Sequence, residues 1–307
     1  MNPDQKLSVI IPHLNEPDNL RRCLRSLDAQ RSDDLDFEII VVDNGSAEPP
    51  YNICTEFADV RLEREPVPGP GPARNRGARV ARNRILAFID ADCVAEPGWA
   101  RSIVDAMTER RDIDFAGGDI GILMTDPQRP TAVEAYESIY AYRARLYIEK
   151  HGYAATGNMA VRAGVFGAVG PFGGISTMED TEWGQRATRL GYHAAFLPDA
   201  KVLTPSCKSF PELAVRWDRH IAHEFRSYGD SAAGMLRWLA YCAVMALSPA
   251  GEIPTILRSD RVSGVRSRWL AFTCVSRVRF YRFRKMMELV YRRNALAIVS
   301  TWNRKSS

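Results

Sequence analysis

The sequence predicts an α/β protein. A mainly parallel, Rossmann-like sheet with helices on both faces is followed by a helical C-terminal extension. Up to about residue 205, apolar runs of five to seven residues alternate with helix-like stretches. Such short, continuously apolar strands are typical of a parallel sheet that is buried on both faces. After Pro205 the alternation stops and only helical patterns follow. We therefore expect two domains, residues 1–205 and residues 206–307.

The strands are marked by β-branched residues, and the helices by apolar residues three or four positions apart. Pro12 closes the first strand, Asn44-Gly45 forms a turn after the second, and Pro97 suits the first turn of a helix. On these criteria we predict strands at Leu7–Pro12, Phe37–Asp43 and Ile85–Ile89, another strand opening at Gly157-Asn158, and helices through Leu20 to Leu27, at Ala73–Arg84, from Pro97 onward, at Ala132–Lys150, from Glu179 through Leu190, and at Phe210–Tyr228, Ala232–Leu247 and Trp269–Val299.

The composition is that of a globular chain: 307 residues, of which 46% are hydrophobic and 25% charged. The mean hydropathy is negative, which excludes a multi-span membrane protein. No basic segment followed by a long apolar stretch opens the chain, and the six cysteines form no CxxC pair. We therefore expect a cytoplasmic protein with reduced thiols rather than a secreted, disulfide-bonded one.

Two carboxylates, Asp90 and Asp92, come directly after the buried strand Ile85–Ile89. Paired charges in such a place are costly unless something binds them. Carboxylates at positions i and i+2 beyond a strand end can share a divalent cation, one of them directly and the other through water or a ribose hydroxyl. On the residues alone, metal binding and simple solvation are equally favoured.

Glu179 and Asp180 begin a predicted helix after the flexible pair Gly173-Gly174. Adjacent carboxylates at a helix start commonly do no more than complement the helix dipole. Because a second acidic site lies upstream, one of them could instead act as a general base beside a metal-bound substrate. Both interpretations stay open.

Polar residues also follow the first two predicted strands, in Pro12–Glu16 and in Asp43–Ser46. Ligands of parallel sheets bind beyond the carboxyl ends of the strands. A polar floor at this place suits a nucleotide base and ribose, whereas ordinary turn chemistry explains the same residues without a ligand.

Taken in order and spacing, these segments resemble a family 2 glycosyltransferase. The set is Leu7–Glu16, Phe37–Ser46, Ala73–Gly77, Phe88–Asp92, Gly157-Asn158 and Glu179–Trp183. It covers about two-thirds of the chain, and the ordered set is more specific than any member. The resemblance implies a GT-A fold, a nucleotide-diphosphate sugar as donor, Mn²⁺ or Mg²⁺ as cofactor, and inversion at the anomeric carbon. It further implies a saccharide or lipid-linked acceptor.

The resemblance also implies roles for single residues. Asp92 matches the metal-binding position together with Asp90, while Asp180 matches the general base and Glu179 its helper. The positions that match the donor-nucleotide pocket are Pro12, Glu16, Asp43, Asn44, Arg74 and Asp90, and those that match acceptor or sugar contacts are Gly157, Asn158 and Trp183.

Three positions depart from the family pattern. Many relatives carry a second Asp where Asn44 stands, an aromatic residue where Leu14 stands, and a metal-binding His after the last strand, where this chain reads Val202–Pro205. UDP is therefore not fixed as the donor nucleotide, and the resemblance leaves Asp92, diphosphate oxygens and water as metal ligands. The QxxRW motif of processive synthases is missing after Asp180, which favours transfer of one sugar.

The last third of the chain is basic. From Lys208 to Ser307, 18 Lys and Arg stand against seven Asp and Glu, a balance of +11. The arginines in Arg277–Arg293 alternate with apolar residues, which suits a helix lying on an anionic membrane surface. A packed helix with a solvated basic face is the equal alternative, and the ten apolar residues Trp238–Leu247 are too short to span a bilayer.

We therefore expect a glycosyltransferase that is peripheral on the cytoplasmic face of the membrane. No nucleic-acid recognition module is visible, so nucleic acid is not an expected partner, and a homodimer stays open. Two other functions also stay open, an idle relative that binds nucleotide sugar or membrane, and a nucleotidyltransferase. Intact Asp92 and Asp180 argue against the first. The second should carry a glycine-rich loop with a basic residue where this chain has Pro12–Glu16.

Overall fold

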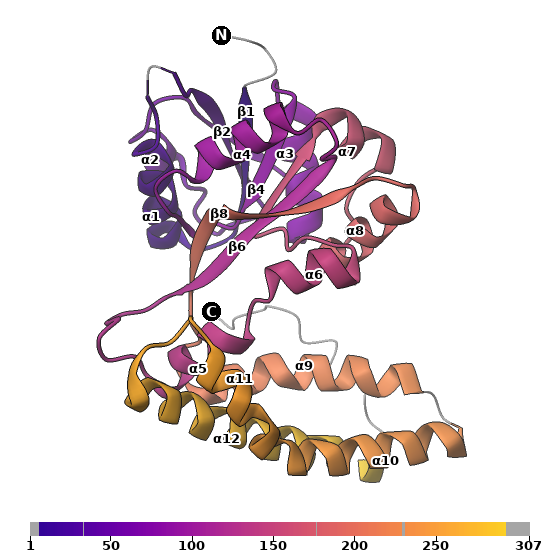
Figure 1. The fold of residues 1–307 in the computed structure, drawn as a ribbon. Helices are drawn as coiled ribbons and strands as arrows, with labels where there is room; N and C mark the ends of the chain where they lie inside the picture. Colours follow the sequence, from indigo (N-terminus) through magenta and orange to yellow (C-terminus); the bar gives the residue numbers. More distant parts are fainter. Residues whose placement is uncertain (1–5, 33, 176, 229–230, 293–307) are drawn as a thin grey trace. The chain divides into compact units, whose positions relative to one another are not determined.

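The computed structural model describes residues 6–32, 34–175, 177–228 and 231–292 (Figure 1). Within these ranges the chain forms two compact units. The sheet unit comprises residues 6–123 and 143–205, and the helical unit comprises residues 124–142 and 206–292. Each unit has its own buried apolar side chains.

The division differs from the predicted one, because residues 124–142 belong to the helical unit. The reason is packing: α5 (Ala132–Tyr140) lies along α12 (Gly264–Arg292), and its Val133 and Tyr136 share an apolar cluster with Val275. The single helix that we predicted at Ala132–Lys150 is therefore two helices, α5 in the helical unit and α6 (Ala144–His151) in the sheet unit.

The sheet unit contains one eight-stranded sheet with the order β3-β2-β1-β4-β7-β6-β8-β5. The pairs β3–β2, β2–β1, β1–β4 and β6–β8 are parallel, whereas β7 runs antiparallel to β4 and β6, and β5 antiparallel to β8. The predicted mainly parallel sheet is confirmed. The strands are β1 (Leu7–His13), β2 (Phe37–Asp43), β3 (Val60–Arg64), β4 (Ile85–Ile89), β5 (Val94–Ala95), β6 (Phe115–Leu123), β7 (Asn158–Arg162) and β8 (Ala194–Pro205).

Helices cover both faces of this sheet, as the apolar strands predicted. Ile10 of β1 faces a cluster with α3, α7 and α8, and its neighbours Val9 and Ile11, which alternate to the other face, are also fully buried. The remaining helices of the sheet unit are α1 (Pro17–Asp28), α2 (Tyr51–Cys54), α3 (Pro70–Val80), α4 (Trp99–Glu109), α7 (Ala163–Val169) and α8 (Glu179–Arg189).

Helix α3 begins three residues earlier than predicted and ends four residues earlier. Its first turn contains Pro70 and Pro72, which suit a helix start because their missing N–H groups need no partner there. Gly77 lets the helix approach β1 closely, since a Cβ at this position would lie 2.4 Å from Cγ2 of Ile10. Helix α3 therefore packs directly on strands β1 and β2.

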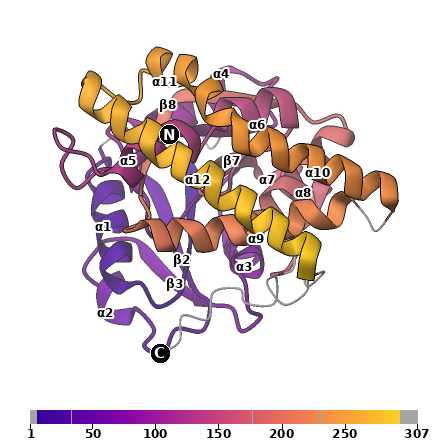
Figure 2. The same ribbon diagram turned by 90° about the horizontal axis from the view of Figure 1, so that it is seen from below.

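The helical unit contains α5, α9 (Phe210–Tyr228), α10 (Ala232–Leu247), the 3₁₀ turn η2 (Ser248–Glu252), α11 (Ile253–Arg258) and α12. Figure 2 shows α12 running across α9 and beside α10, and the contacts agree. The indole Nε1 of Trp238 donates to the carbonyl of Met286 at 3.2 Å, which ties α10 to α12. Helix α12 starts five residues before the predicted Trp269, and the part of the prediction after Arg292 lies outside the described residues.

Candidate active site

The site begins where β1 and β2 end, because their register places His13 beside Asp43. The backbone N–H of Glu16 donates to Nε2 of His13 at 3.3 Å, so in the neutral ring Nδ1 carries the proton. Nδ1 lies 3.3 Å from Oγ of Ser46 and 3.6 Å from Oδ1 of Asp43. Burial lowers the pKa of His13, although Asp43 acts in the opposite direction. A neutral His13 thus joins the two polar segments that the sequence predicted to be neighbours.

Asp43 is fully buried and one of its oxygens is free. Oδ1 accepts from the backbone N–H of Ser46 at 3.3 Å, whereas Oδ2 has no hydrogen-bond partner in the described part of the structure. Buried polar atoms are nearly always paired, so an orphaned acceptor at a strand end marks a place for a donor from a ligand. Pro12 and Glu16, which were also predicted at this pocket, are half-buried beside it.

Asn44 has a structural role in addition to the predicted one. Its Nδ2 donates to the carbonyls of Glu65 (2.9 Å) and Val67 (2.8 Å), and its Oδ1 accepts from the N–H of Gly69 at 2.7 Å. Both amide hydrogens and one lone pair of the oxygen are used within the protein, so the Asn44 side chain fixes the loop before α3. The sequence could not show this, because the partners are backbone groups more than twenty residues away.

Arg74 connects acidic residues from two distant parts of the sequence. Its Nη2 donates to Oδ1 of Asp90 at 2.5 Å, and its Nη1 donates to Oε1 of Glu179 at 2.9 Å. The Arg74 side chain is only 4% exposed. Burial acts to lower its pKa, but the two carboxylates outweigh burial and raise it. The predicted metal region and the predicted base region are therefore one site.

Asp92 lies half-buried two residues further along, beside Asp90. Burial raises the pKa of Asp92 to about 6, and the charges of Asp90 and Glu16 add to the effect. Among the described side chains, no group of three His, Cys, Asp or Glu converges on one point. Mg²⁺ is commonly held by one or two carboxylates together with substrate phosphates, so a buried carboxylate with few protein partners fits such an ion.

Gly157 lies against Asp90. A Cβ at position 157 would come within 2.9 Å of Oδ2 of Asp90, which leaves little room for any side chain. Gly157 therefore lies beside the Asp90 carboxylate, and its predicted contact with acceptor or sugar stays a prediction.

Asp180 sits in the first turn of α8 with Glu179. Its Oδ1 accepts from the backbone N–H of Thr181 at 2.6 Å and from Oγ1 of Thr181 at 3.2 Å. Burial raises the pKa of Asp180, and the charge of Glu179 raises it further. A carboxylate whose pKa is raised is a stronger base than an ordinary aspartate, which is what proton removal from a hydroxyl needs.

Two tyrosines stand next to Asp180. Burial raises the pKa of Tyr153 to about 12, and its neighbours Tyr147 and Asp180 add to the effect. The ring of Tyr147 stacks on that of Tyr153 with centroids 5.1 Å apart and planes at 12°. Thr181 and Tyr153 were not predicted as site residues. Thr181 follows the acidic pair directly, but Tyr153 gives no signal of its own because it reaches the site only through the fold.

Asn158 and Trp183, which were predicted to contact acceptor or sugar, belong to the core. Asn158 donates to the carbonyls of Asp119 and Ala200, each at 2.8 Å, and accepts from the indole of Trp99 at 2.8 Å. Trp183 is fully buried and donates to the carbonyl of Gly170 at 2.8 Å. Both side chains are satisfied inside the protein, so they hold β7 and α8 in place rather than bind a substrate.

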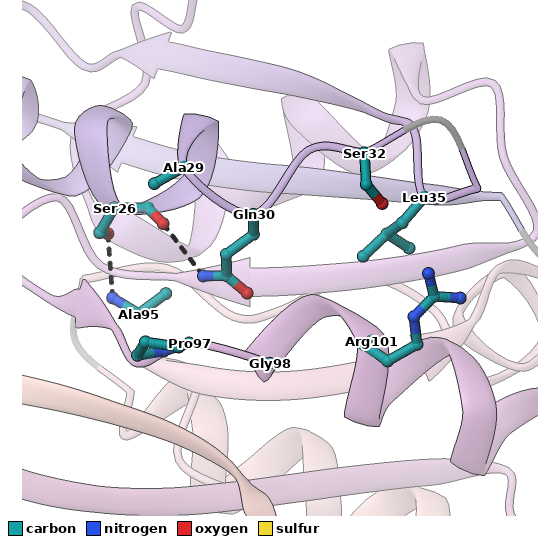
Figure 3. A pocket seen from close by; sticks show the side chains of 9 residues that line it. All are labelled: Ser26, Ala29, Gln30, Ser32, Leu35, Ala95, Pro97, Gly98 and Arg101. Carbon is teal, nitrogen blue, oxygen red and sulfur yellow. Dashed lines mark hydrogen bonds between the residues drawn. The ribbon is translucent and has the colours of Figure 1, made fainter.

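A separate groove of about 370 Å³ lies between the end of α1 and the start of α4 (Figure 3). Its polar groups are paired with one another: Oγ of Ser26 accepts from the N–H of Ala95 at 3.0 Å, and Gln30 donates to the carbonyl of Ser26 at 3.0 Å. None of the predicted site residues lines it. We assign no role to this groove.

Comparisons with known proteins show the family and the fold of the chain. A family model described as glycosyl transferase family 2 matches residues 8–170. The chain is 33% identical over 214 residues to glycosyltransferase AglE of Haloferax volcanii, which covers 67% of this chain and 69% of that protein. It is 38% identical over 120 residues to the uncharacterized glycosyltransferase YibD of Escherichia coli, covering 38% of this chain and 34% of that protein.

Two solved structures share the fold. One is the mannosyltransferase PcManGT of Pyrobaculum calidifontis in complex with GDP-Man and Mn²⁺, with a TM-score of 0.56 at 15% identity, covering 94% of this chain and 87% of that one. The other is residues 1–349 of TarS of S. aureus in complex with UDP-GlcNAc, with a TM-score of 0.53 at 15% identity, covering 94% and 76%. The family model spans more than half of the chain, and the AglE alignment covers two-thirds of both proteins. The chain therefore belongs to glycosyl transferase family 2 and is a glycosyltransferase with the GT-A fold.

Proposed function

We propose that this glycosyltransferase moves one sugar, with inversion, from a nucleotide-diphosphate sugar to a saccharide or lipid-linked acceptor. The observation that carries the proposal is the cluster around Arg74, which brings Asp90 and Glu179 together and so places Asp180 near the acidic end of β4. The bound GDP-Man and UDP-GlcNAc in the two structures of the same fold support a donor of this class.

In this proposal the base of the donor nucleotide binds at the end of β2. The free Oδ2 of Asp43 is a buried acceptor, and uracil and guanine both carry a ring N–H that can donate to it. The neutral His13 holds Asp43 and the following turn without competing for the base as a cation. Thymine carries the same N–H, so the nucleotide stays open among UDP, dTDP and GDP.

Asp92, with Asp90 beside it, would hold the divalent cation, Mn²⁺ or Mg²⁺. The cation, when bound, neutralises the charge that develops on the departing diphosphate. The Mn²⁺ in the structure of PcManGT supports this assignment.

Asp180 serves as the general base. As the oxygen of an acceptor hydroxyl forms its bond to the anomeric carbon, its proton passes to the Asp180 carboxylate. The bond between that carbon and the diphosphate oxygen breaks, and the electron pair leaves with the nucleoside diphosphate. A single displacement of this kind inverts the anomeric centre. Glu179 raises the basicity of Asp180 and is itself held by Arg74.

We also propose that the enzyme is cytoplasmic and peripheral on the inner face of the membrane. A lipid-linked acceptor would be met there, and the balance of +11 in residues 208–307 favours an anionic surface.

The function is tested with a panel of UDP-, GDP- and dTDP-sugars, each with Mn²⁺, Mg²⁺ or chelator, and with membrane extract as acceptor source. We expect one donor to be consumed and the product to have the opposite anomeric configuration by NMR. Asp180→Asn should lower kcat by a factor on the order of 10²–10⁴ with little change in donor KM.

Asp92→Ala should abolish the increase in turnover that the metal produces. Asp112→Asn changes an exposed acid outside the site and should behave as wild type. Donor binding without turnover under all conditions would identify the idle relative instead. Retention of configuration would exclude the single displacement.

A further inference from the structure

The outward face of α10 is almost entirely apolar. The side chains described as exposed on this helix are Ala233, Leu236, Arg237, Leu239, Ala240, Ala243, Val244 and Leu247, of which only Arg237 is charged. Leu236, Val244 and Leu247 are 70%, 62% and 81% exposed. An exposed apolar surface of this kind on a folded protein marks a site of interaction with a membrane, a ligand or another protein.

More large apolar side chains are exposed in the segment that follows α10. Ile253 and Leu257 of α11, and Val265 and Trp269 at the start of α12, are all exposed. We call the exposed side chains of Leu236, Leu239, Val244, Leu247, Ile253, Leu257, Val265 and Trp269 the apolar face.

Charges around the apolar face are mostly positive. Arg237, Arg258 and Arg266 are exposed along it. In residues 231–270 the two acids are Asp260, which is exposed, and Glu252, which is half-buried and paired with Arg279. With five arginines against two acids, this segment has a balance of +3.

Two of the α12 arginines that we expected at a membrane contact side chains of the helical unit instead. Arg282 donates to Glu224 at 3.0 Å and lies 4.2 Å over the ring of Trp217, and the guanidinium of Arg277 lies 4.0 Å over the ring of Phe210. These two arginines are therefore packed within the helical unit.

The segment Ala233–Arg258 is long and apolar enough to cross a bilayer, judged by length and composition alone. Its other face argues against crossing. Trp238, Cys242 and Met245 are at most 2% exposed and share a cluster with Met286 of α12, and the helix is interrupted at Ser248. A helix with one packed face and one apolar exposed face suits a position in the plane of the membrane.

We propose that the apolar face docks on an anionic lipid bilayer. The aliphatic side chains enter the boundary between headgroups and acyl chains, Arg237, Arg258 and Arg266 contact lipid phosphates, and Trp269 lies at headgroup depth. A protein partner would need polar side chains for about one hydrogen bond per 100–200 Å² of interface, and the outward face of α10 offers only Arg237. The proposal names the surface behind the peripheral location proposed above and rests on it.

The test is co-sedimentation of the full chain with vesicles of phosphatidylcholine alone or mixed with phosphatidylglycerol. We expect binding to the mixed vesicles that weakens as the salt concentration rises. The double variant Val244→Ser/Leu247→Ser should weaken it roughly tenfold or more, because two inserted aliphatic side chains are lost. The matched control is Leu190→Ser/Val215→Ser, which makes the same chemical change at two side chains that are each 60% exposed elsewhere.

Donor hydrolysis without lipid separates this proposal from the enzymatic one. It should be unchanged in both double variants, since none of the four residues belongs to the active site. Equal vesicle binding by wild type and Val244→Ser/Leu247→Ser overturns the proposal, as does no vesicle binding by wild type. If light scattering shows a dimer that this variant alone disrupts, and vesicles do not bind, the face is covered by a second copy instead. If the wild-type protein hydrolyses no donor, this result counts against the enzymatic proposal only.

Discussion

Arg74 shows how much of the site depends on one buried side chain. It is paired with Asp90 and Glu179 while being almost inaccessible to solvent. Replacing one partner of a buried ion pair leaves uncompensated charge, which typically costs about 3–5 kcal/mol. We expect Arg74→Met to lower the free energy of unfolding by about this amount in urea denaturation.

The control for Arg74→Met is Arg79→Met on the same helix, where the side chain is 62% exposed. An exposed ion pair contributes about 0–1 kcal/mol, so this variant should stay within that range of wild type. Equal losses in the two variants would show that the Arg74 cluster is not a stabilising centre.

The pH dependence of turnover should respond to Glu179. Burial and then the charge of Glu179 raise the pKa of Asp180, so Asp180 loses its proton only at higher pH than an ordinary aspartate. Glu179→Gln removes the neighbouring charge and keeps an acceptor for Arg74. The pKa of Asp180 then falls, and the acid limb of kcat/KM should move to lower pH.

Glu182→Gln, one turn further along α8 and paired with Arg186, serves as the control for that pH profile and should leave it in place. An acid limb that stays fixed, or moves to higher pH, in Glu179→Gln would contradict the role given to the acidic pair.

The loop between β3 and α3 depends on Asn44. Its amide supplies three hydrogen bonds to backbone groups of residues 65–69, among them the N–H of Gly69. Asn44→Ala should speed hydrogen exchange at the Gly69 amide and raise the donor KM, because the loop borders the Asp43 pocket. Asn52→Ala, at an exposed position in α2, is the matched change. Unchanged hydrogen exchange at the Gly69 amide would mean that the loop keeps its conformation without the Asn44 side chain.

Helix α3 is held close to β1 by a glycine. A Cβ on Gly77 would meet Cγ2 of Ile10 at 2.4 Å, and overpacking of this kind costs about 1–3 kcal/mol. Gly77→Ala should therefore lower the thermal unfolding midpoint. Gly164→Ala in α7 has no atom within 4 Å of its new Cβ, so it should stabilise by about 0.4–1 kcal/mol through the unfolded chain. The opposite order of stabilities would contradict this packing.

The elements were predictable to different degrees for physical reasons. Strands β2 and β4 match the predicted bounds because each contains a continuously apolar buried run, which leaves a local signal in the sequence. The turn between α5 and α6 was missed because residues 132–150 keep a helical pattern, while the break is imposed by packing on α12, which lies more than a hundred residues away.

The site residues divide in the same way. The acidic residues were found because charge at a strand or helix end is visible in the sequence, and the family resemblance assigned their roles. Asn158 and Trp183 stand at motif positions but serve the core, and His13 was passed over although it lies within a motif. Each of the three has a partner between 13 and 59 residues away, and only the fold shows these contacts.

At the scale of the whole molecule, the two units carry separate apolar clusters, so their stabilities should be separable. Trp183 belongs to the sheet unit and Trp238 to the helical unit, and both are fully buried with one hydrogen bond from the indole. Trp→Ala changes in cores cost about 3–5 kcal/mol. In calorimetry, Trp183→Ala should lower the midpoint temperature of one unfolding transition, and Trp238→Ala should lower that of the other.

Every predicted site residue lies in the sheet unit. On heating, donor hydrolysis should therefore be lost at the temperature where the sheet unit unfolds, which is the transition that Trp183→Ala shifts. A single transition that both variants shift equally would show that the two units unfold as one.

The helical unit is assembled from two stretches of chain, and this has a consequence for synthesis on the ribosome. Helix α5 is made more than a hundred residues before α12, the helix against which Val133 and Tyr136 are buried. Until α12 has been translated, these side chains lack their native partner and are exposed to aggregation or chaperone capture. A chain terminated after Pro205 would keep α5 in this state permanently, so truncation there would not release a clean catalytic domain.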